Sequence, residues 1–192
     1  MSHILIGVTG FAGSGKDTFS DELVLHHNFV KLEFARKIKE ILSDLYDVPI
    51  QSFYDRVLKN TSHMVLGGLT PREACQRIGT EGFRNMISRS TWVNYLIRHA
   101  NEVIGGGSSV VVSDVRFPDE FARLKEMGAI MVGIERRDSE SHRHESEVHV
   151  TELIKQCDHV IANDKSLENY MIKIADFCNS VTCQKNKGVM KI

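Results

Sequence analysis

Hydrophobic residues follow two patterns along this chain, and each pattern predicts a different kind of element. Short continuous apolar runs that are bounded by glycine or polar residues predict strands buried on both faces. Apolar residues spaced three or four positions apart predict helices with one buried face. The predicted strands are residues 3–8, 29–34, 110–112, 129–134 and 159–162. The predicted helices are residues 16–27, 35–46, 70–87 with a break near Gly79, 91–104, 118–127 and 167–177.

One helix start is marked with particular clarity. Thr70, Pro71 and Glu73 have the spacing of a capping box with proline at the first helical position. In such a box the threonine hydroxyl accepts a backbone N–H of the first turn, and the glutamate accepts the N–H of the threonine. The sequence therefore predicts a helix that begins directly after Thr70.

The alternation of short strands with helices predicts an α/β fold of three layers, a parallel β-sheet flanked by helices on both faces. Residues 35–104 interrupt this alternation, because only helical patterns occur between the second and third strands. We interpret this stretch as an inserted helical region that binds a substrate. The polar segment at about 136–149 is interpreted as a short lid. Together they form a single domain whose core comprises residues 1–34 and 108–180.

Composition narrows the class of protein further. The chain has 192 residues, of which 42% are hydrophobic and 26% charged, proportions that exclude a disordered or fibrous protein. A net charge of −1 lacks the basic field that stable nucleic-acid binding needs. No apolar stretch is long enough for a membrane span, and the N-terminus lacks the pattern of a signal peptide. Four widely spaced cysteines indicate reduced thiols, so we expect a cytoplasmic protein, with a homodimer left open.

A glycine-rich loop near the N-terminus carries the strongest chemical signal. Gly10 and Gly15, followed by Lys16, match the G-x-x-x-x-G-K core of a phosphate-binding (Walker A) loop between a predicted strand and a predicted helix. Small residues such as Gly13 and Ser14 let backbone N–H groups converge on phosphate oxygens, and the helix N-terminus adds its dipole. Lys16 would supply a mobile positive charge to the phosphates. The loop predicts a nucleoside triphosphate site.

Two positions bear on a metal ion. Asp17 stands where the motif has Ser or Thr, and the hydroxyl follows one place later as Thr18, which we expect to order Mg²⁺ through water. Asp114 ends a buried strand, at the edge of the sheet where ligands bind, and could hold Mg²⁺ or its waters. Arg116 could reach the transferring phosphoryl group. The alternative for the last two is a structural Asp–Arg pair that caps the next helix.

Missing motifs exclude other classes of phosphate-loop protein. A switch GTPase would show N-K-x-D and D-x-x-G motifs, whereas residues 163–165 read Asn-Asp-Lys and no glycine follows Asp114 at the required distance. Motor and helicase ATPases are larger than this domain. A kinase that acts on a small molecule fits the size.

The order of several short motifs resembles that of the deoxynucleoside monophosphate kinases of tailed bacteriophages, from residue 4 to about 177. The shared signatures are Gly13-Ser14-Gly15-Lys16-Asp17-Thr18, Phe34-Ala35-x-x-Ile38-Lys39, Arg72-x-x-x-Gln76-x-x-Gly79-Thr80-Glu81, Trp92-Val93, Asp114-x-Arg116, His144-x-Ser146-Glu147 and Ile161-x-Asn163-Asp164-x-Ser166-Leu167-Glu168. The resemblance implies a P-loop NTPase fold and ATP- and Mg²⁺-dependent phosphoryl transfer to a deoxynucleoside monophosphate, giving the diphosphate and ADP. The chain departs from the family in having Lys37 where proline is common, and in its shorter length, which bears on base choice.

Candidate residues can then be assigned to parts of the reaction. Lys16 and Arg116 are the first choice for cations around the transferring group, and Arg84 and Arg136 the second. By resemblance, Asn163 and Asp164 follow the last strand and would pack against the donor adenine. The candidates for the acceptor nucleotide are Lys39, Arg72, Gln76, Gly79, Thr80, Arg84, Trp92 and, by resemblance, His144.

Other interpretations stay open. Trp92 could belong to the core, Lys39 could be a solvated lysine, and Asp164 could cap the last helix. His142, His144 and His149 are better read as lid or surface residues than as metal ligands. The alternatives for the whole chain are another small-metabolite kinase, such as a dephospho-coenzyme A or phosphomevalonate kinase, and a nucleotide-binding regulator without catalysis.

Overall fold

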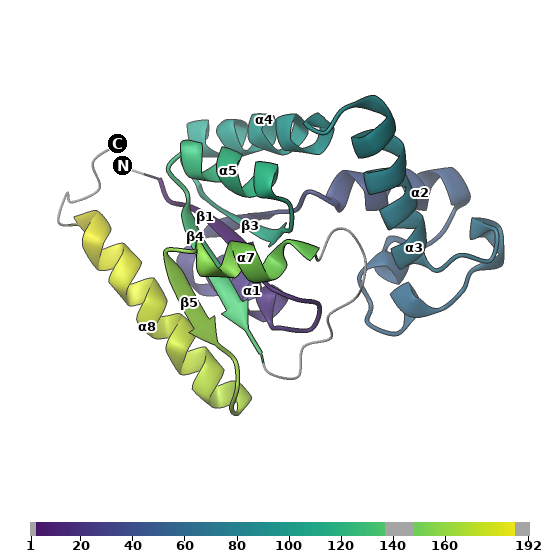
Figure 1. Cartoon of the computed structure of the whole chain (residues 1–192). Helices are drawn as coiled ribbons and strands as arrows, with labels where there is room; N and C mark the ends of the chain where they lie inside the picture. Colours follow the sequence, from purple (N-terminus) through teal and green to yellow (C-terminus); the bar gives the residue numbers. More distant parts are fainter. Residues whose placement is uncertain (1–2, 137–147, 187–192) are drawn as a thin grey trace. The chain divides into compact units, whose positions relative to one another are not determined.

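Five strands form one sheet in the order β2-β3-β1-β4-β5, and every neighbouring pair is parallel (Figure 1). This computed structural model describes residues 3–136 and 148–186, the last five of them as backbone. The strands are β1 (Leu5–Thr9), β2 (Phe29–Leu32), β3 (Ser109–Val115), β4 (Ile130–Glu135) and β5 (His159–Ala162). The predicted parallel sheet is confirmed.

One face of the sheet is covered by α1 (Lys16–His27) and α8 (Leu167–Asn186). Ile6 of β1, Phe19 of α1 and Ile174 of α8 belong to one buried cluster, and all three are fully buried. Because β1 consists of buried residues throughout, its second face needs a cover as well.

That second face packs against α5 (Pro118–Glu126) and α7 (Val150–Lys155). Gly7 of β1 lies against Leu124 of α5, and Ile154 of α7 lies against β4. Right-handed crossovers require this arrangement, because the chain moves in opposite directions along the sheet from β1 to β2 and from β3 to β4. Helices on both faces complete the three predicted layers.

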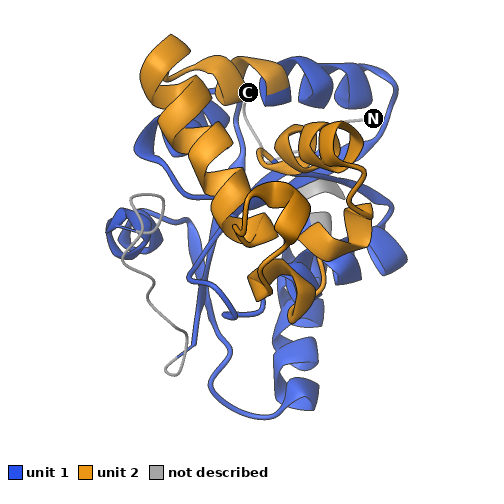
Figure 2. Ribbon diagram, turned by 90° about the vertical axis from the view of Figure 1, so that its right-hand side faces the viewer, with its two compact units in different colours: residues 1–33, 96–192 blue, residues 34–95 orange. Residues whose placement is uncertain are grey.

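The chain divides into two compact units (Figure 2). Unit 1 comprises residues 1–33 and 96–192 and contains the whole sheet; unit 2 comprises residues 34–95. Unit 2 contains α-helices, 3₁₀-helices and a π-helix, and the boundary between the two units falls within α4 (Thr91–Gly105). Its other elements are α2 (Arg36–Tyr46), the 3₁₀-helices η1 (Ile50–Phe53), η2 (Leu58–Asn60) and η3 (Met64–Leu66), α3 (Pro71–Gln76) and the π-helix η4 (Arg77–Ile87).

The predicted capping box at Thr70 is confirmed in atomic detail. Thr70 Oγ1 accepts a hydrogen bond from Glu73 N at 3.2 Å, and Glu73 Oε2 accepts one from Thr70 N at 2.8 Å. Thr70 Oγ1 also donates to Glu73 Oε2 at 2.9 Å, and the hydrogen bonds from the Thr70 backbone N–H and hydroxyl to this carboxylate lower the pKa of Glu73. The helix that starts here changes character after Gln76, where α-helical bonding gives way to the wider π-helix.

Some elements differ from the prediction. The six-residue helix α7 was not predicted, and α8 extends beyond the predicted end at residue 177. Most of the predicted lid, with His142 and His144, lies outside the described residues.

Within the described ranges no helix is both long and apolar enough to cross a membrane. Cys75, Cys157 and Cys178 are thiols rather than disulfide partners.

Candidate active site

The glycine-rich loop leaves the carboxyl end of β1, near the centre of the sheet. From β1 the chain proceeds to β2 on one side, whereas β4 and β5 lie on the other side. Ligands of open parallel sheets bind at such a change of direction, outside the carboxyl ends of the strands. The position of the loop therefore fits the predicted phosphate site.

The backbone of the loop adopts conformations that favour glycine. Gly10 has φ +156°, Gly13 +74° and Gly15 +107°, values that L side chains rarely adopt. A Cβ on Gly10 would lie 2.6 Å from Ile134 O, so this position needs glycine for space as well. Lys16 opens α1 directly after the loop, which brings the N-terminal end of the helix dipole to the site.

The Lys16 side chain lies across this loop. Its Nζ donates hydrogen bonds to Gly10 O at 2.8 Å and to Phe11 O at 2.7 Å, and the residue is 9% exposed. Ser14 N donates to Phe11 O at 3.1 Å and closes a turn within the loop. A buried ammonium group held at the centre of a glycine-rich turn is the feature expected of a polyphosphate site.

The loop is contacted by two side chains from the segment that comprises the turn after β5 and the start of α8. Asn163 Nδ2 donates to Ser14 O at 2.9 Å, and the Tyr170 hydroxyl donates to Gly15 O at 3.0 Å. Burial raises the pKa of Tyr170 well above its usual value, so its hydroxyl remains protonated and a donor. The sequence had indicated Asn163 for the adenine and had not indicated Tyr170, whose aromatic ring reads as an ordinary core residue.

Asp164 occupies the exposed side of the same turn. Lys173 Nζ donates to its Oδ1 at 3.2 Å and to Ala162 O at 2.6 Å. The hydrogen bond from Lys173 lowers the pKa of Asp164. Contact of either Asn163 or Asp164 with an adenine stays a prediction.

The aspartate that replaces the motif's hydroxyl has a basic partner. Lys31 Nζ of β2 lies 3.2 Å from Asp17 Oδ1, 2.9 Å from Asp21 Oδ1 and 4.0 Å from Glu33 Oε1. Burial lowers the pKa of Lys31, but the charges and hydrogen bonds of Asp17 and Asp21 raise it by more, so the pKa lies above 10.5. Thr18, the next residue of α1, is half-buried.

Asp114 lies in a local irregularity at the end of β3. Gly7 pairs with Val112 and Thr9 with Val115, so that one residue of β1 faces two residues of β3. A bulge of this kind redirects side chains and is common next to active sites. It places the half-buried Asp114 next to the strand that carries the phosphate loop.

A buried carboxylate fixes the backbone after this strand. Glu120 Oε2 of α5 accepts hydrogen bonds from Arg116 N at 2.9 Å and from Phe117 N at 3.0 Å, and Glu120 is 4% exposed. Glu120, which sequence reasoning missed, therefore caps α5 and fixes the backbone N–H of the half-buried Arg116. Arg136 directly follows β4, at the same carboxyl edge, and is exposed.

Unit 2 holds the predicted acceptor residues that the structure describes. Trp92 is 7% exposed; its Nε1 donates to Gly79 O at 2.9 Å and its ring lies 5.0 Å from that of Phe83. Thr80 and Arg84 are buried in the π-helix, and the guanidinium of Arg84 donates to Arg89 O at 3.2 Å. Base stacking by Trp92 and phosphate binding by Arg84 stay predictions.

Other acceptor candidates lie closer to the surface of unit 2. Lys39 Nζ lies 3.8 Å from the centre of the Tyr54 ring, a cation–π contact. Arg72 and Gln76 are half-buried on α3. Tyr54 had not been indicated by the sequence, since it lies in a stretch without a regular pattern. The lid candidate His144 lies outside the described residues.

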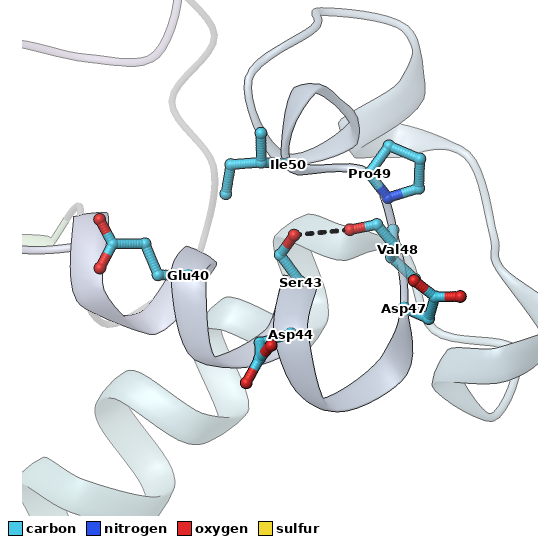
Figure 3. Close-up of a pocket in the computed structure, with 7 residues that line it drawn as sticks. All are labelled: Glu40, Ser43, Asp44, Asp47, Val48, Pro49 and Ile50. Carbon is cyan, nitrogen blue, oxygen red and sulfur yellow. Dashed lines mark hydrogen bonds between the residues drawn. The ribbon is translucent and has the colours of Figure 1, made fainter.

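A pocket of about 430 Å³ in unit 2 has the wrong chemistry for a nucleotide (Figure 3). Glu40, Asp44 and Asp47 line it, together with Ser43, whose hydroxyl donates to Val48 O at 2.7 Å. Three carboxylates repel a phosphate group, and the predicted acceptor residues are not among those that line the pocket.

The donors near the loop suit a magnesium ion bound mainly through phosphates. Mg²⁺ in kinases keeps several waters and uses one or two protein oxygens in addition to phosphate oxygens. Asp114 at the strand end and Thr18 on α1 offer a carboxylate and a hydroxyl of this kind. In the part of the chain that the structure describes, no group of three His, Cys, Asp or Glu residues could hold a metal by itself.

Comparisons with known proteins identify the family to which the chain is similar. A family model described as deoxynucleotide monophosphate kinase matches residues 50–174, well over half of the chain. A protein of Acanthamoeba polyphaga mimivirus, provisionally named a deoxynucleotide monophosphate kinase, is 28% identical over 97% of this chain and 99% of its own length. The deoxynucleotide monophosphate kinase of Escherichia phage RB69 is 33% identical over 54% of this chain and 42% of its own.

A solved structure supports the fold. Dephospho-CoA kinase from Campylobacter jejuni superimposes with a TM-score of 0.53 at 19% identity, over 97% of this chain and 98% of that one. At this identity the likeness concerns the fold alone.

Proposed function

The chain belongs to the deoxynucleotide monophosphate kinase family, and we propose that it transfers the γ-phosphoryl group of ATP to a deoxynucleoside monophosphate. An oxygen of the acceptor's 5′-phosphate attacks the γ-phosphorus, and the bond from that phosphorus to the β–γ bridging oxygen breaks. The products are a deoxynucleoside diphosphate and ADP. The observation that carries the proposal is the cradle of loop and Lys16 at the carboxyl end of β1.

The donor phosphates are assigned to this cradle. The N-terminus of α1 and the ammonium group of Lys16 attract the negative charge of the β- and γ-phosphates. Thr18 and Asp114 would hold Mg²⁺ or its waters. An ion held there would supply positive charge against the negative charge of the phosphates.

Phosphoryl transfer needs positioned cations more than covalent chemistry. Arg116 is supported in this role by Glu120, which fixes its backbone at the edge of the sheet. Arg136, at the end of the next strand but one, is a second cation for the same edge.

The acceptor nucleotide is assigned to unit 2. Arg72 and Gln76 lie one helical turn apart on α3, so that a guanidinium and an amide present themselves on one face. Lys39 on α2 and Arg84 in the π-helix are further cations for its phosphate. Within this group the Gln76 amide, with a donor and an acceptor, suits pairing with a base edge.

The proposal is tested by a coupled assay that detects ADP. ATP and Mg²⁺ are supplied with dAMP, dGMP, dCMP, dTMP, their ribonucleotide counterparts, modified deoxynucleotides and dephospho-coenzyme A, each alone. We expect ADP formation with at least one deoxynucleoside monophosphate, and the matching diphosphate by mass spectrometry. Transfer to dephospho-coenzyme A alone, or to none of the acceptors by folded protein, would contradict the proposal.

Two variants separate a kinase from a nucleotide-binding regulator. Arg116→Ala should lower kcat by orders of magnitude and leave ATP binding nearly unchanged, since its guanidinium is assigned to the transferring group. Lys16→Ala should weaken ATP binding as well. The matched control is Arg123→Ala, because Arg123 lies on the same segment but pairs with Glu126 on the exposed side of α5. A nucleotide-binding regulator would form no ADP, so neither substitution could lower a rate of phosphoryl transfer.

A further inference from the structure

We propose that Asn163 and Tyr170 are positioning residues that hold the phosphate loop in its anion-binding shape. The proposal rests on the function proposed above and adds a device outside the loop motif. Both residues belong to the segment from the end of β5 to the second turn of α8, about 150 positions after the loop (the separations are 149 and 155). Their hydrogen bonds end on two consecutive loop carbonyls, Ser14 O and Gly15 O.

The geometry of the peptide bond turns these contacts into control over the loop's donors. A trans peptide is planar, so its C=O and the following N–H point in opposite directions, and the described chain has no cis peptide. When Asn163 holds Ser14 O, the Gly15 N–H is therefore directed to the opposite side. When Tyr170 and Phe19 N both hold Gly15 O, the Lys16 N–H is directed in the same manner. These two amides lie where the loop meets α1.

The loop needs such support because of its composition. Glycine loses more conformational freedom on ordering than any other residue, and Gly15 adopts φ +107°. Its neighbours leave no room for a side chain at position 15, because a Cβ there would lie 2.6 Å from Asn163 Nδ2 and 3.1 Å from the Tyr170 ring. Preformed donors bind an anion without first having to be ordered.

The support is itself rigid. Tyr170 is 1% exposed and its ring belongs to the cluster between the sheet, α1 and α8, so the hydroxyl that contacts Gly15 O is held on a tightly packed ring. Asn163 follows β5, and its backbone N–H donates to Glu135 O of β4 at 2.7 Å. Lys173 ties the end of β5 to α8 through Ala162 O and the Asp164 carboxylate.

The experiment compares a ligand that has only phosphates with one that also has a base. Binding of inorganic tripolyphosphate and of ATP is measured by calorimetry on the full chain, for wild type, Asn163→Ala and Tyr170→Phe. Each substitution should weaken both ligands by the same factor, about fivefold for the loss of one hydrogen bond. In the kinase assay the KM for ATP should rise and the KM for the acceptor should stay unchanged. General damage to the fold would affect both.

Matched controls are Asn179→Ala on α8 and Tyr46→Phe at the end of α2, which change exposed side chains of the same two residue types. Should Asn163→Ala fail to fold, Tyr170→Phe, which keeps the buried ring, decides the question. Weaker ATP binding with unchanged tripolyphosphate binding would show that Asn163 contacts the base and would overturn the proposal. Unchanged binding of both ligands, or a wild type that does not bind tripolyphosphate, would also overturn it. Equal losses in a protein that phosphorylates no acceptor would sink the proposed function and leave this inference standing.

Discussion

Removal of the Glu120 carboxylate should destabilise the protein far more than its place on a helix suggests. Glu120 is 4% exposed and accepts the N–H groups of both Arg116 and Phe117. Glu120→Ala leaves the part-buried N–H of Arg116 and the buried N–H of Phe117 without this acceptor, at about 1–3 kcal/mol each, so about 2–6 kcal/mol in total. Glu120→Gln keeps a carbonyl oxygen within reach but loses the charge, which costs about 1–2 kcal/mol.

Urea unfolding followed by circular dichroism measures both losses, and melting temperatures should fall by roughly 2–4 °C for each kcal/mol. The control is Glu126→Ala at the other end of α5, where the glutamate pairs with Arg123 on the surface; its effect should stay within about 0.5 kcal/mol. Because Glu120 holds the backbone N–H of Arg116, the folded Glu120→Gln variant should also lose kcat and keep its affinity for ATP. Equal stabilities of Glu120→Ala and Glu126→Ala would refute the reasoning.

Three further predictions concern other parts of the chain. Gly79→Ala places a Cβ 2.7 Å from Ile38 Cδ1 and should lower the free energy of unfolding by about 1–3 kcal/mol. Ile38→Val removes that atom and should therefore relieve the loss in a double-mutant cycle. Purely additive effects of the two substitutions would contradict the clash. Lys31→Met should destabilise the protein at pH 8. Because Lys31 has a raised pKa, its contribution is complete below about pH 10.5 and is lost as the pH rises through the folded-state pKa, so the difference from wild type should shrink there in pH-dependent melting. Burial and the charge of Asp158 raise the pKa of Cys157 to about 12, so iodoacetamide at pH 8 should label it much faster in urea than in the folded protein, as read by peptide mapping.

The parts of the fold that sequence could predict are those governed by local pattern. The apolar run 110–112 marks the centre of β3, and the spacing of Thr70 and Glu73 marks a helix start that the structure reproduces with both hydrogen bonds. The glycine-rich loop could be found because its chemistry needs small residues and a lysine in consecutive positions. In each case the determining residues are neighbours in the sequence.

The rest depends on partners that are distant in the sequence. Tyr170 and Ile174 look alike in a helical pattern, and only the packing of α8 on α1 brings one hydroxyl to the loop. The bulge before Val115 arises from pairing with β1 and leaves no trace in the residues of β3. The π-helix after Gln76 could not be predicted either, because over 11 residues its apolar spacing cannot be told apart from that of an α-helix.

The aspartate after Lys16 shows why a departure from a motif has to be judged together with its tertiary partners. In sequence terms Asp17 adds a negative charge beside a site that binds polyphosphate, which argues against the function. In the structure Lys31 of β2 lies between the carboxylates of Asp17 and Asp21, at 3.2 and 2.9 Å. The pair offsets the charge and draws the Asp17 side chain toward β2. A net charge of −1 is therefore compatible with a polyphosphate site, since what matters is where the few cations lie and which carboxylates they already neutralise.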